Sequence, residues 1–108
     1  MNKKYILIKN EDIQNVINSS SKYVNRYFVI YYKDNNISNN RYCISVSKKI
    51  GKANVRNLFK RRIKDILMKN NLKGSNDYVI ILRKAILDLS YTDIKNELLK
   101  MMEVKWKI

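Results

Sequence analysis

The side chains of this chain best suited to chemistry are cationic, and they gather between residues 48 and 64. At about 100° per residue, Arg56, Lys60 and Lys64 share one face of a helix. No Asp or Glu interrupts the stretch. A basic face that is merely solvated usually interleaves acids, whereas crowded like charges favour neutralisation by a polyanion. We expect phosphate contacts from Lys48, Lys49, Lys52, Arg56, Asn57, Lys60, Arg61 and Lys64.

The chain offers few groups for catalysis of its own. It has no His, and its single Cys, Cys43, can build neither a zinc site nor a disulfide framework. Gly51-Lys52 lacks the upstream Gly and the following hydroxyl of a phosphate-binding loop. The adjacent acids Glu11 and Asp12 suit the first turn of a helix better than acid–base chemistry. We therefore predict no catalytic residue, and no metal ligand is assigned.

Composition points to one globular domain over residues 1–108. The chain is 45% hydrophobic and carries 23 Lys and Arg against 9 Asp and Glu, a net charge of +14. Such a charge attracts nucleic acid, and anionic membranes less specifically. No apolar run approaches the roughly 20 residues that span a bilayer. The start is too short in apolar residues for a signal peptide, so a cytoplasmic location is expected.

Helical apolar spacing predicts the element that presents these cations. A helix over residues 54–70 would place one apolar stripe on a core. The stripe consists of Val55, Leu58, Phe59, Ile63, Ile66 and Leu67. Asn10 is the expected cap of a first helix with Ile13, Val16 and Ile17 on its apolar side. Residues 90–93 resemble a helix capping box. They predict a last helix that buries Ile94, Leu98, Met101 and Met102.

Three strands are expected, over residues 23–32, 41–47 and 77–83. The first two read as a hairpin closed by the polar turn 34–40, and the apolar third predicts burial on both faces. Tyr27 and Tyr31 would share a face of the first strand. Each could stack on an unpaired base or be a half-buried strand residue with an exposed hydroxyl.

One long motif resembles the signature of the protein subunit of bacterial ribonuclease P. It consists of Ser45-Val46-Ser47-Lys48-Lys49, Gly51-Lys52-Ala53, Arg56-Asn57 and Lys60-Arg61. Further matches span nearly the whole chain, at Lys9-Asn10-Glu11-Asp12, Asn25-Arg26, Phe28-Val29, Asp77-Tyr78, Ile81, Arg83-Lys84 and Leu89-Ser90-Tyr91.

The resemblance implies an α+β fold in the order αβββαβα, a two-layer sandwich like a ribosomal-protein domain. It also implies a left-handed βαβ crossover, against the usual right-handed rule. In function it implies a ribonuclease P holoenzyme, an endoribonuclease that removes the 5′ leader of precursor tRNA. The catalytic RNA subunit performs the hydrolysis with magnesium, which the RNA mainly holds. The implied partners are this RNA and precursor tRNA, with no membrane and no protein partner required.

The same resemblance implies that the basic helix and its lead-in loop contact the RNA subunit. A cleft between the first helix and the sheet would hold the leader, with candidate residues Ile13, Ile17, Tyr27, Tyr31 and Arg83. Ile13 and Ile17 stand where the family normally has Phe. Leu58 stands where the family usually has Arg, and Arg62, a helical neighbour, could replace that guanidinium.

The main alternative is an unrelated basic RNA-binding protein of the ribosomal type. It would explain charge and fold but not the detailed motif. A helix-turn-helix DNA binder requires two short helices joined by a tight turn, whereas the cationic helix here follows strands. An amphipathic helix on a membrane would give its apolar face to lipid, yet this chain has a sheet to cover.

Overall fold

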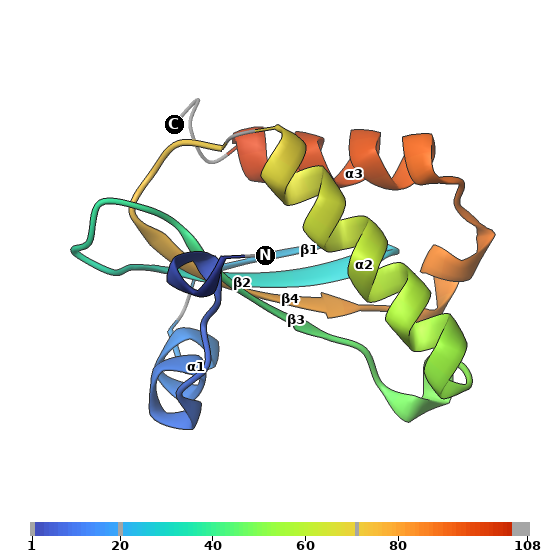
Figure 1. Cartoon of the computed structure of the whole chain (residues 1–108), viewed down its shortest axis with the longest axis horizontal. Coiled ribbons are helices and arrows are strands. Elements are labelled where there is room, and N and C mark those ends of the chain that lie inside the picture. Colours follow the sequence, from blue (N-terminus) through green and yellow to red (C-terminus); the bar gives the residue numbers. More distant parts are fainter. Residues whose placement is uncertain (1, 20, 71, 105–108) are drawn as a thin grey trace.

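The computed structural model describes residues 2–19, 21–70 and 72–104, and its elements follow the order αβββαβα (Figure 1). The helices and strands are α1 (Asn10–Ile17), β1 (Lys22–Val24), β2 (Phe28–Asp34), β3 (Arg41–Ser45), α2 (Ala53–Lys69), β4 (Asn76–Leu82) and α3 (Tyr91–Val104). Three short 3-10 helices are η1 (Lys3–Tyr5), η2 (Lys48–Ile50) and η3 (Lys84–Asp88). This order confirms the expected α+β class. In the described part of the chain, no helix is long and apolar enough to cross a membrane.

The four strands form one sheet in the order β1-β2-β4-β3. β1, β2 and β4 are antiparallel neighbours, while β3 and β4 run parallel and are joined through α2. In Figure 1 the chain leaves β3 at the lower edge, passes through α2 in front of the sheet, and returns in β4 above it. This connection is left-handed, as the resemblance implies.

The expected hairpin of the strands over residues 23–32 and 41–47 is wrong, because β4 lies between β2 and β3. β4 is the most apolar strand, and all but one of its residues are buried. Its Ile80 lies opposite Ile30 of β2 on one side and Ile44 of β3 on the other. A strand buried in this way takes the centre of a sheet, so the polar loop 35–40 must cross it.

The strand expected over residues 23–32 is also two strands rather than one. The Asn25 carboxamide oxygen accepts hydrogen bonds from the backbone N–H groups of Tyr27 and Phe28, both at 2.8 Å. These bonds turn the chain back, so that β1 pairs antiparallel with β2. The β-branched and aromatic run conceals a turn that a single Asn side chain creates.

Of the two expected helix caps, one is confirmed. The Ser90 hydroxyl accepts from the Asp93 N–H at 3.2 Å, at the start of α3. Asn10, in contrast, is the first residue of α1, and the cap position belongs to Lys9, which makes no side-chain capping bond. The acids Glu11 and Asp12 still lie in the first turn of α1, where the helix dipole favours them.

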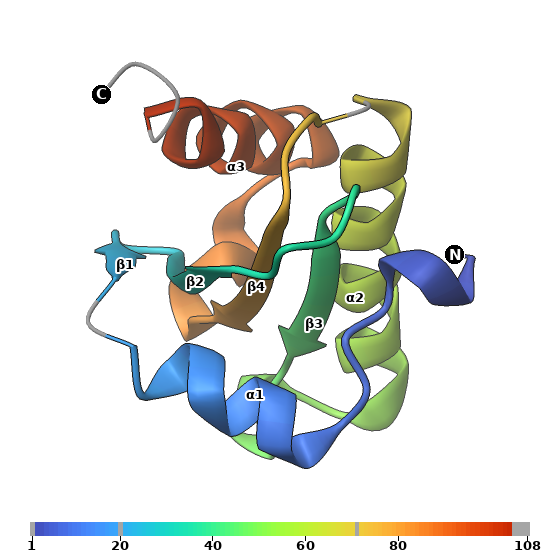
Figure 2. The same ribbon diagram turned by 90° about the vertical axis from the view of Figure 1, so that its left-hand side faces the viewer.

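Helices cover both faces of the sheet (Figure 2). α2 and α3 pack on one face and enclose the main core, which includes Phe28, Ile63, Ile80 and Leu98. The short α1 packs on β2 and β4 at the opposite face. There, buried Leu7, Val16 and Val79 form a second group, the α1 cluster, with Ile13, Ile17, Tyr31, Cys43 and Ile81 partly buried against it.

Leu58 departs from the expected apolar stripe of α2. Phe59, Ile63, Ile66 and Leu67 are buried, whereas Leu58 is 36% exposed. The first turns of α2 extend beyond the ends of the strands in Figure 1, so they have less sheet to cover. The helix therefore exposes an apolar side chain on the surface that carries its cations.

Candidate nucleic-acid interface

The lysines that precede α2 point into solvent because the short helix that carries them is anchored by the buried Ile50. Lys48 and Lys49 lie on η2 and are exposed, while Ile50 is buried in the main core. The Ser47 hydroxyl caps η2 by accepting from the Lys49 N–H at 3.1 Å. Because Ile50 anchors this short helix, its lysines and the following Lys52 project into solvent from a defined backbone.

The junction between η2 and α2 is tight. A Cβ at Gly51 would lie 3.3 Å from the Val55 side chain, tighter than nine in ten real Cβ contacts. The Arg56 guanidinium donates from Nε to the Gly51 carbonyl at 3.2 Å. This bond fixes Arg56 against the loop and leaves its two terminal NH₂ groups available to a ligand.

The cations of residues 48–64 have no acidic partner within the described residues. The ion pairs found there are Arg41–Asp77 at 2.7 Å and Lys69–Asp65 at 3.1 Å. Asp65, the first acid after the basic stretch, accepts from the Tyr91 hydroxyl at 2.5 Å as well as from Lys69. These two bonds hold the Asp65 pKa below its ordinary value. The carboxylate is therefore committed to α3 and Lys69, and the charge of α2 stays uncompensated.

Lys60 and Lys64 border a groove between α2 and the start of the chain. The groove has a volume of about 180 Å³ and is also lined by Ile6, Leu7, Tyr42, Cys43 and Ile44. The Leu7 N–H donates to the Tyr42 carbonyl at 2.9 Å, which fixes the N-terminal segment against the edge of β3. Burial raises the Cys43 pKa while Lys60 opposes the shift, and this half-buried thiol packs against the α1 cluster.

Arg62, the neighbour proposed to replace a missing arginine, lies against an aromatic ring. Its guanidinium carbon is 5.1 Å from the centroid of the Phe59 ring. Such cation–π contacts orient a guanidinium and leave its edge free for hydrogen bonds. The replacement of the arginine lost at Leu58 stays a prediction.

The candidate leader residues separate into two groups. Ile13 and Ile17 of α1 pack with Tyr31 of β2 in the α1 cluster, as expected. The Lys22 ammonium lies 6.0 Å from the centroid of the Tyr31 ring, because β1 pairs with β2 so that Lys22 is opposite Tyr31. Sequence reasoning missed Lys22, since only the register of the two strands brings it to Tyr31.

Tyr27 and Arg83 lie elsewhere. Tyr27 precedes β2 and packs against the main core, edge-to-face with Phe28 at 6.5 Å between ring centroids. The expectation that it shares a strand face with Tyr31 is wrong, because the turn at Asn25 removes it from the strand. Arg83 is exposed and donates from Nη1 to the Asn25 carbonyl at 3.0 Å. Its backbone N–H donates to the Tyr27 carbonyl, so Arg83 is hydrogen-bonded to the turn that contains Asn25 and Tyr27.

An α+β domain with a cationic surface that has no acidic partner among the described residues is typical of a nucleic-acid-binding protein. The particular family follows from comparison with known proteins: residues 1–105 match the Ribonuclease P family, and the chain belongs to it. Membership gives the role of protein subunit of ribonuclease P, an endoribonuclease of tRNA processing when assembled as a ribonucleoprotein holoenzyme. An unrelated ribosomal-type protein is not favoured.

Individual relatives agree over nearly the whole chain. The ribonuclease P protein component of Mycoplasma mycoides is 43% identical over 95% of this chain and 97% of that protein. The component of Streptococcus thermophilus is 37% identical over 96% and 95%. Among solved structures, the Staphylococcus aureus RNase P protein has a TM-score of 0.85 at 32% identity and covers 94% of each chain. The Thermotoga maritima protein has a TM-score of 0.81 at 27% identity, covering 88% of this chain and 92% of its own.

Proposed function

We propose that the chain binds the phosphates of the catalytic RNA subunit through one defined surface. This cationic surface comprises Lys48, Lys49, Lys52, Arg56, Asn57, Lys60, Arg61 and Lys64. The observation that carries the proposal is that none of its lysines or arginines is paired with an acid of the described residues. Bringing RNA to such a surface removes like-charge repulsion and releases the counterions of the phosphates.

For the substrate, we propose precursor tRNA with its unpaired 5′ leader lying against the α1 cluster. Tyr31 is partly buried in the α1 cluster together with Ile13 and Ile17, and the Lys22 ammonium lies 6.0 Å from its ring centroid. An aromatic ring next to a cation suits a nucleotide, because the base stacks while the phosphate is neutralised. Tyr27 and Arg83 fall outside this proposal, since they pack at the turn around Asn25.

The hydrolysis belongs to the RNA subunit in this proposal, with magnesium held mainly by the RNA. Within the described residues, no group of three or more His, Cys, Asp or Glu side chains could hold a metal ion. The side chains of this chain bind and orient RNA. The cytoplasmic location stays a prediction.

The salt dependence of RNA affinity tests the proposal. Each phosphate contact contributes roughly 0.7–0.9 to the log–log slope of affinity against salt, so seven contacting cations predict a slope of roughly −5 to −6. The measurement uses a bacterial ribonuclease P RNA, with an unrelated structured RNA of equal length as competitor. A slope near zero, or equal affinity for both RNAs, would contradict the proposal.

A further inference from the structure

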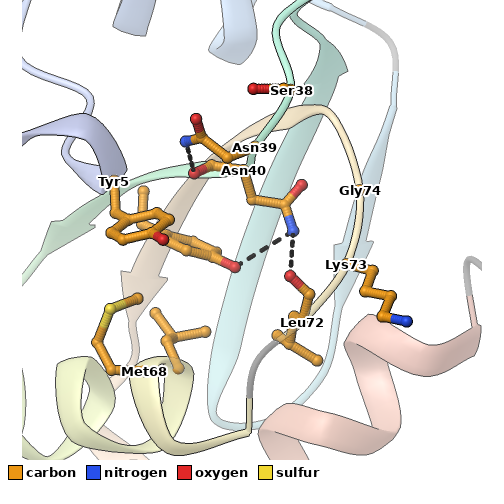
Figure 3. A pocket seen from close by; sticks show the side chains of 10 residues that line it. Tyr5, Ser38, Asn39, Asn40, Met68, Leu72, Lys73 and Gly74 are labelled. Carbon is orange, nitrogen blue, oxygen red and sulfur yellow. Dashed lines mark hydrogen bonds between the residues drawn. The ribbon is translucent and has the colours of Figure 1, made fainter.

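A second concave site lies beyond the cationic surface, where the end of α2 meets the start of the chain (Figure 3). It has a volume of about 430 Å³. Its walls come from η1, from the loop between β2 and β3, from β3, from α2, and from the segment that follows α2. The lining residues are Tyr5, Ser38, Asn39, Asn40, Tyr42, Leu67, Met68, Leu72, Lys73 and Gly74.

The pocket is preformed rather than a gap between loose loops. The Asn39 carboxamide donates to the Lys4 carbonyl at 2.9 Å and to the Asn40 carbonyl at 2.8 Å, which ties the loop to the N-terminal segment. Asn40 is 3% exposed, and its carboxamide oxygen accepts from the Asn76 N–H at 3.0 Å. This bond holds the Asn40 side chain against the start of β4.

Two polar groups of the pocket, the Asn40 Nδ2 and the Ser38 hydroxyl, are only weakly engaged. The Asn40 Nδ2 contacts the Tyr42 hydroxyl and the Leu72 carbonyl at 3.4 and 3.3 Å, both at the long limit of a hydrogen bond (Figure 3). The Ser38 hydroxyl makes no hydrogen bond within the described part of the chain. Two tyrosine rings, Tyr5 and Tyr42, and the thioether of Met68 supply flat or adaptable apolar walls.

The surroundings of the pocket are basic and continuous with the cationic surface. Tyr42 lines both this pocket and the groove that Lys60 and Lys64 border. The Lys4 ammonium lies 4.9 Å from the Tyr5 ring centroid, and Lys73 contributes to the lining. Neither the pocket nor the groove has an acidic lining residue. A strand of RNA that follows α2 past Lys64 therefore arrives at Tyr5.

We propose that this pocket receives one unpaired nucleobase of the RNA subunit bound along α2. The proposal rests on the function proposed above and extends it with a site for a base rather than for phosphates. The flat base lies against Tyr5, and its edge accepts from the Asn40 Nδ2 in place of the long contact to the Tyr42 hydroxyl and exchanges a hydrogen bond with the Ser38 hydroxyl. Base-stacking on an aromatic ring, with donors and acceptors at the base edge, is the usual recognition of unpaired RNA.

Two variants test the pocket without touching the cationic surface. Ser38→Tyr adds a bulky ring from an exposed loop position and fills the pocket, and Tyr5→Ala removes the stacking wall. The matched controls are Tyr5→Phe, which keeps the ring, and Thr92→Tyr, which adds the same bulk at an exposed position of α3. A thermal melt of each variant establishes that it folds.

The readout is base reactivity of a bacterial ribonuclease P RNA toward dimethyl sulfate and carbodiimide. We expect wild type, Tyr5→Phe and Thr92→Tyr to protect a base that becomes reactive with Ser38→Tyr and Tyr5→Ala. Affinity should fall about tenfold with an unchanged salt slope, since a stack and no phosphate contact is lost. Identical protections with Ser38→Tyr and wild type would overturn the pocket even when the salt slope supports the cationic surface. A wild type that fails to bind the RNA would overturn both proposals.

Discussion

Arg61 is the clearest single contributor to the cationic surface, because its side chain is exposed and has no hydrogen bond or ion pair in the described part of the chain. We predict that Arg61→Ala weakens RNA-subunit binding and lowers the magnitude of the log–log salt slope by roughly 0.7–0.9. Filter binding over a salt series measures both. Lys100→Ala, an exposed cation of α3, is the control and should leave the slope unchanged. An unchanged slope for Arg61→Ala would mean that this face is only solvated.

Tyr31 tests the leader proposal at the same scale. A base stacked on its ring contributes roughly 1–3 kcal/mol, so Tyr31→Ala should weaken holoenzyme binding of precursor tRNA by that amount. Binding of mature tRNA, which has no leader, should hardly change. Ile17→Phe restores the usual residue of the family and should maintain or tighten precursor binding.

The comparison requires holoenzyme affinities for substrates with long and absent leaders, and a thermal melt of each variant. Equal losses on both substrates would show that Tyr31 supports the α1 cluster instead of the leader.

A buried ion pair gives a stability prediction that is independent of RNA. Arg41 donates from Nε and Nη2 to the two carboxylate oxygens of Asp77, at 2.8 and 2.7 Å, and Asn35 donates to the same carboxylate at 2.9 Å. The Asp77 side chain is 9% exposed and that of Arg41 27%. Arg41→Ala leaves a buried charge without its cation and should lower the free energy of unfolding by roughly 2–4 kcal/mol.

Urea unfolding of Arg41→Ala, Asp77→Ala and the double variant measures the coupling. The double variant should lose less than the sum of the single variants, because no unpaired charge remains. Strictly additive losses would contradict the pairing.

At the scale of elements, a hydrogen-bonded group joins α2 to α3. The Tyr91 hydroxyl of α3 and Lys69 of α2 both bond Asp65 and hold its pKa below the ordinary value. A lowered carboxyl pKa stabilises the fold above the unfolded value of about 4, and this stabilisation is lost as pH falls through the folded pKa. The same bond raises the Tyr91 pKa, so the effect also fades above about pH 10.

We therefore predict that Tyr91→Phe lowers the melting temperature most between about pH 4 and pH 10, with convergence toward wild type below that window. Thermal melts across pH measure the difference. A Tyr91→Phe deficit that is equally large at pH 2 and pH 7 would show that the bond to Asp65 is not its cause.

Sequence periodicity located α2 to within one residue at each end, because its apolar stripe packs on a core along most of its length. It could not predict that β4 separates β2 from β3, since strand neighbours depend on which strand is buried on both faces. It also missed the turn at Asn25, where one side-chain oxygen outweighs the strand preference of the residues around it.

At the scale of the whole molecule, charge and the lack of His in the sequence predicted nucleic-acid binding with no catalytic side chain, from the residues alone. The left-handed crossover and the leader cleft came only through the family resemblance, because no local pattern encodes them. The proximity of Lys22 to Tyr31, and the placement of Tyr5 and Asn40 around one pocket, depend on the tertiary arrangement. These contacts joined residues far apart in sequence and were therefore beyond periodicity and spacing.

The central claim is that this chain supports an RNA-catalysed reaction, and leader release tests it most directly. The measurement follows 5′-labelled precursor tRNA at low magnesium with a bacterial ribonuclease P RNA alone, with the protein alone, and with both. We predict cleavage at the mature 5′ end with both, little with the RNA alone, and none with rigorously RNA-free protein. Turnover by the RNA-free protein, or no acceleration when the protein joins the RNA, would contradict the account.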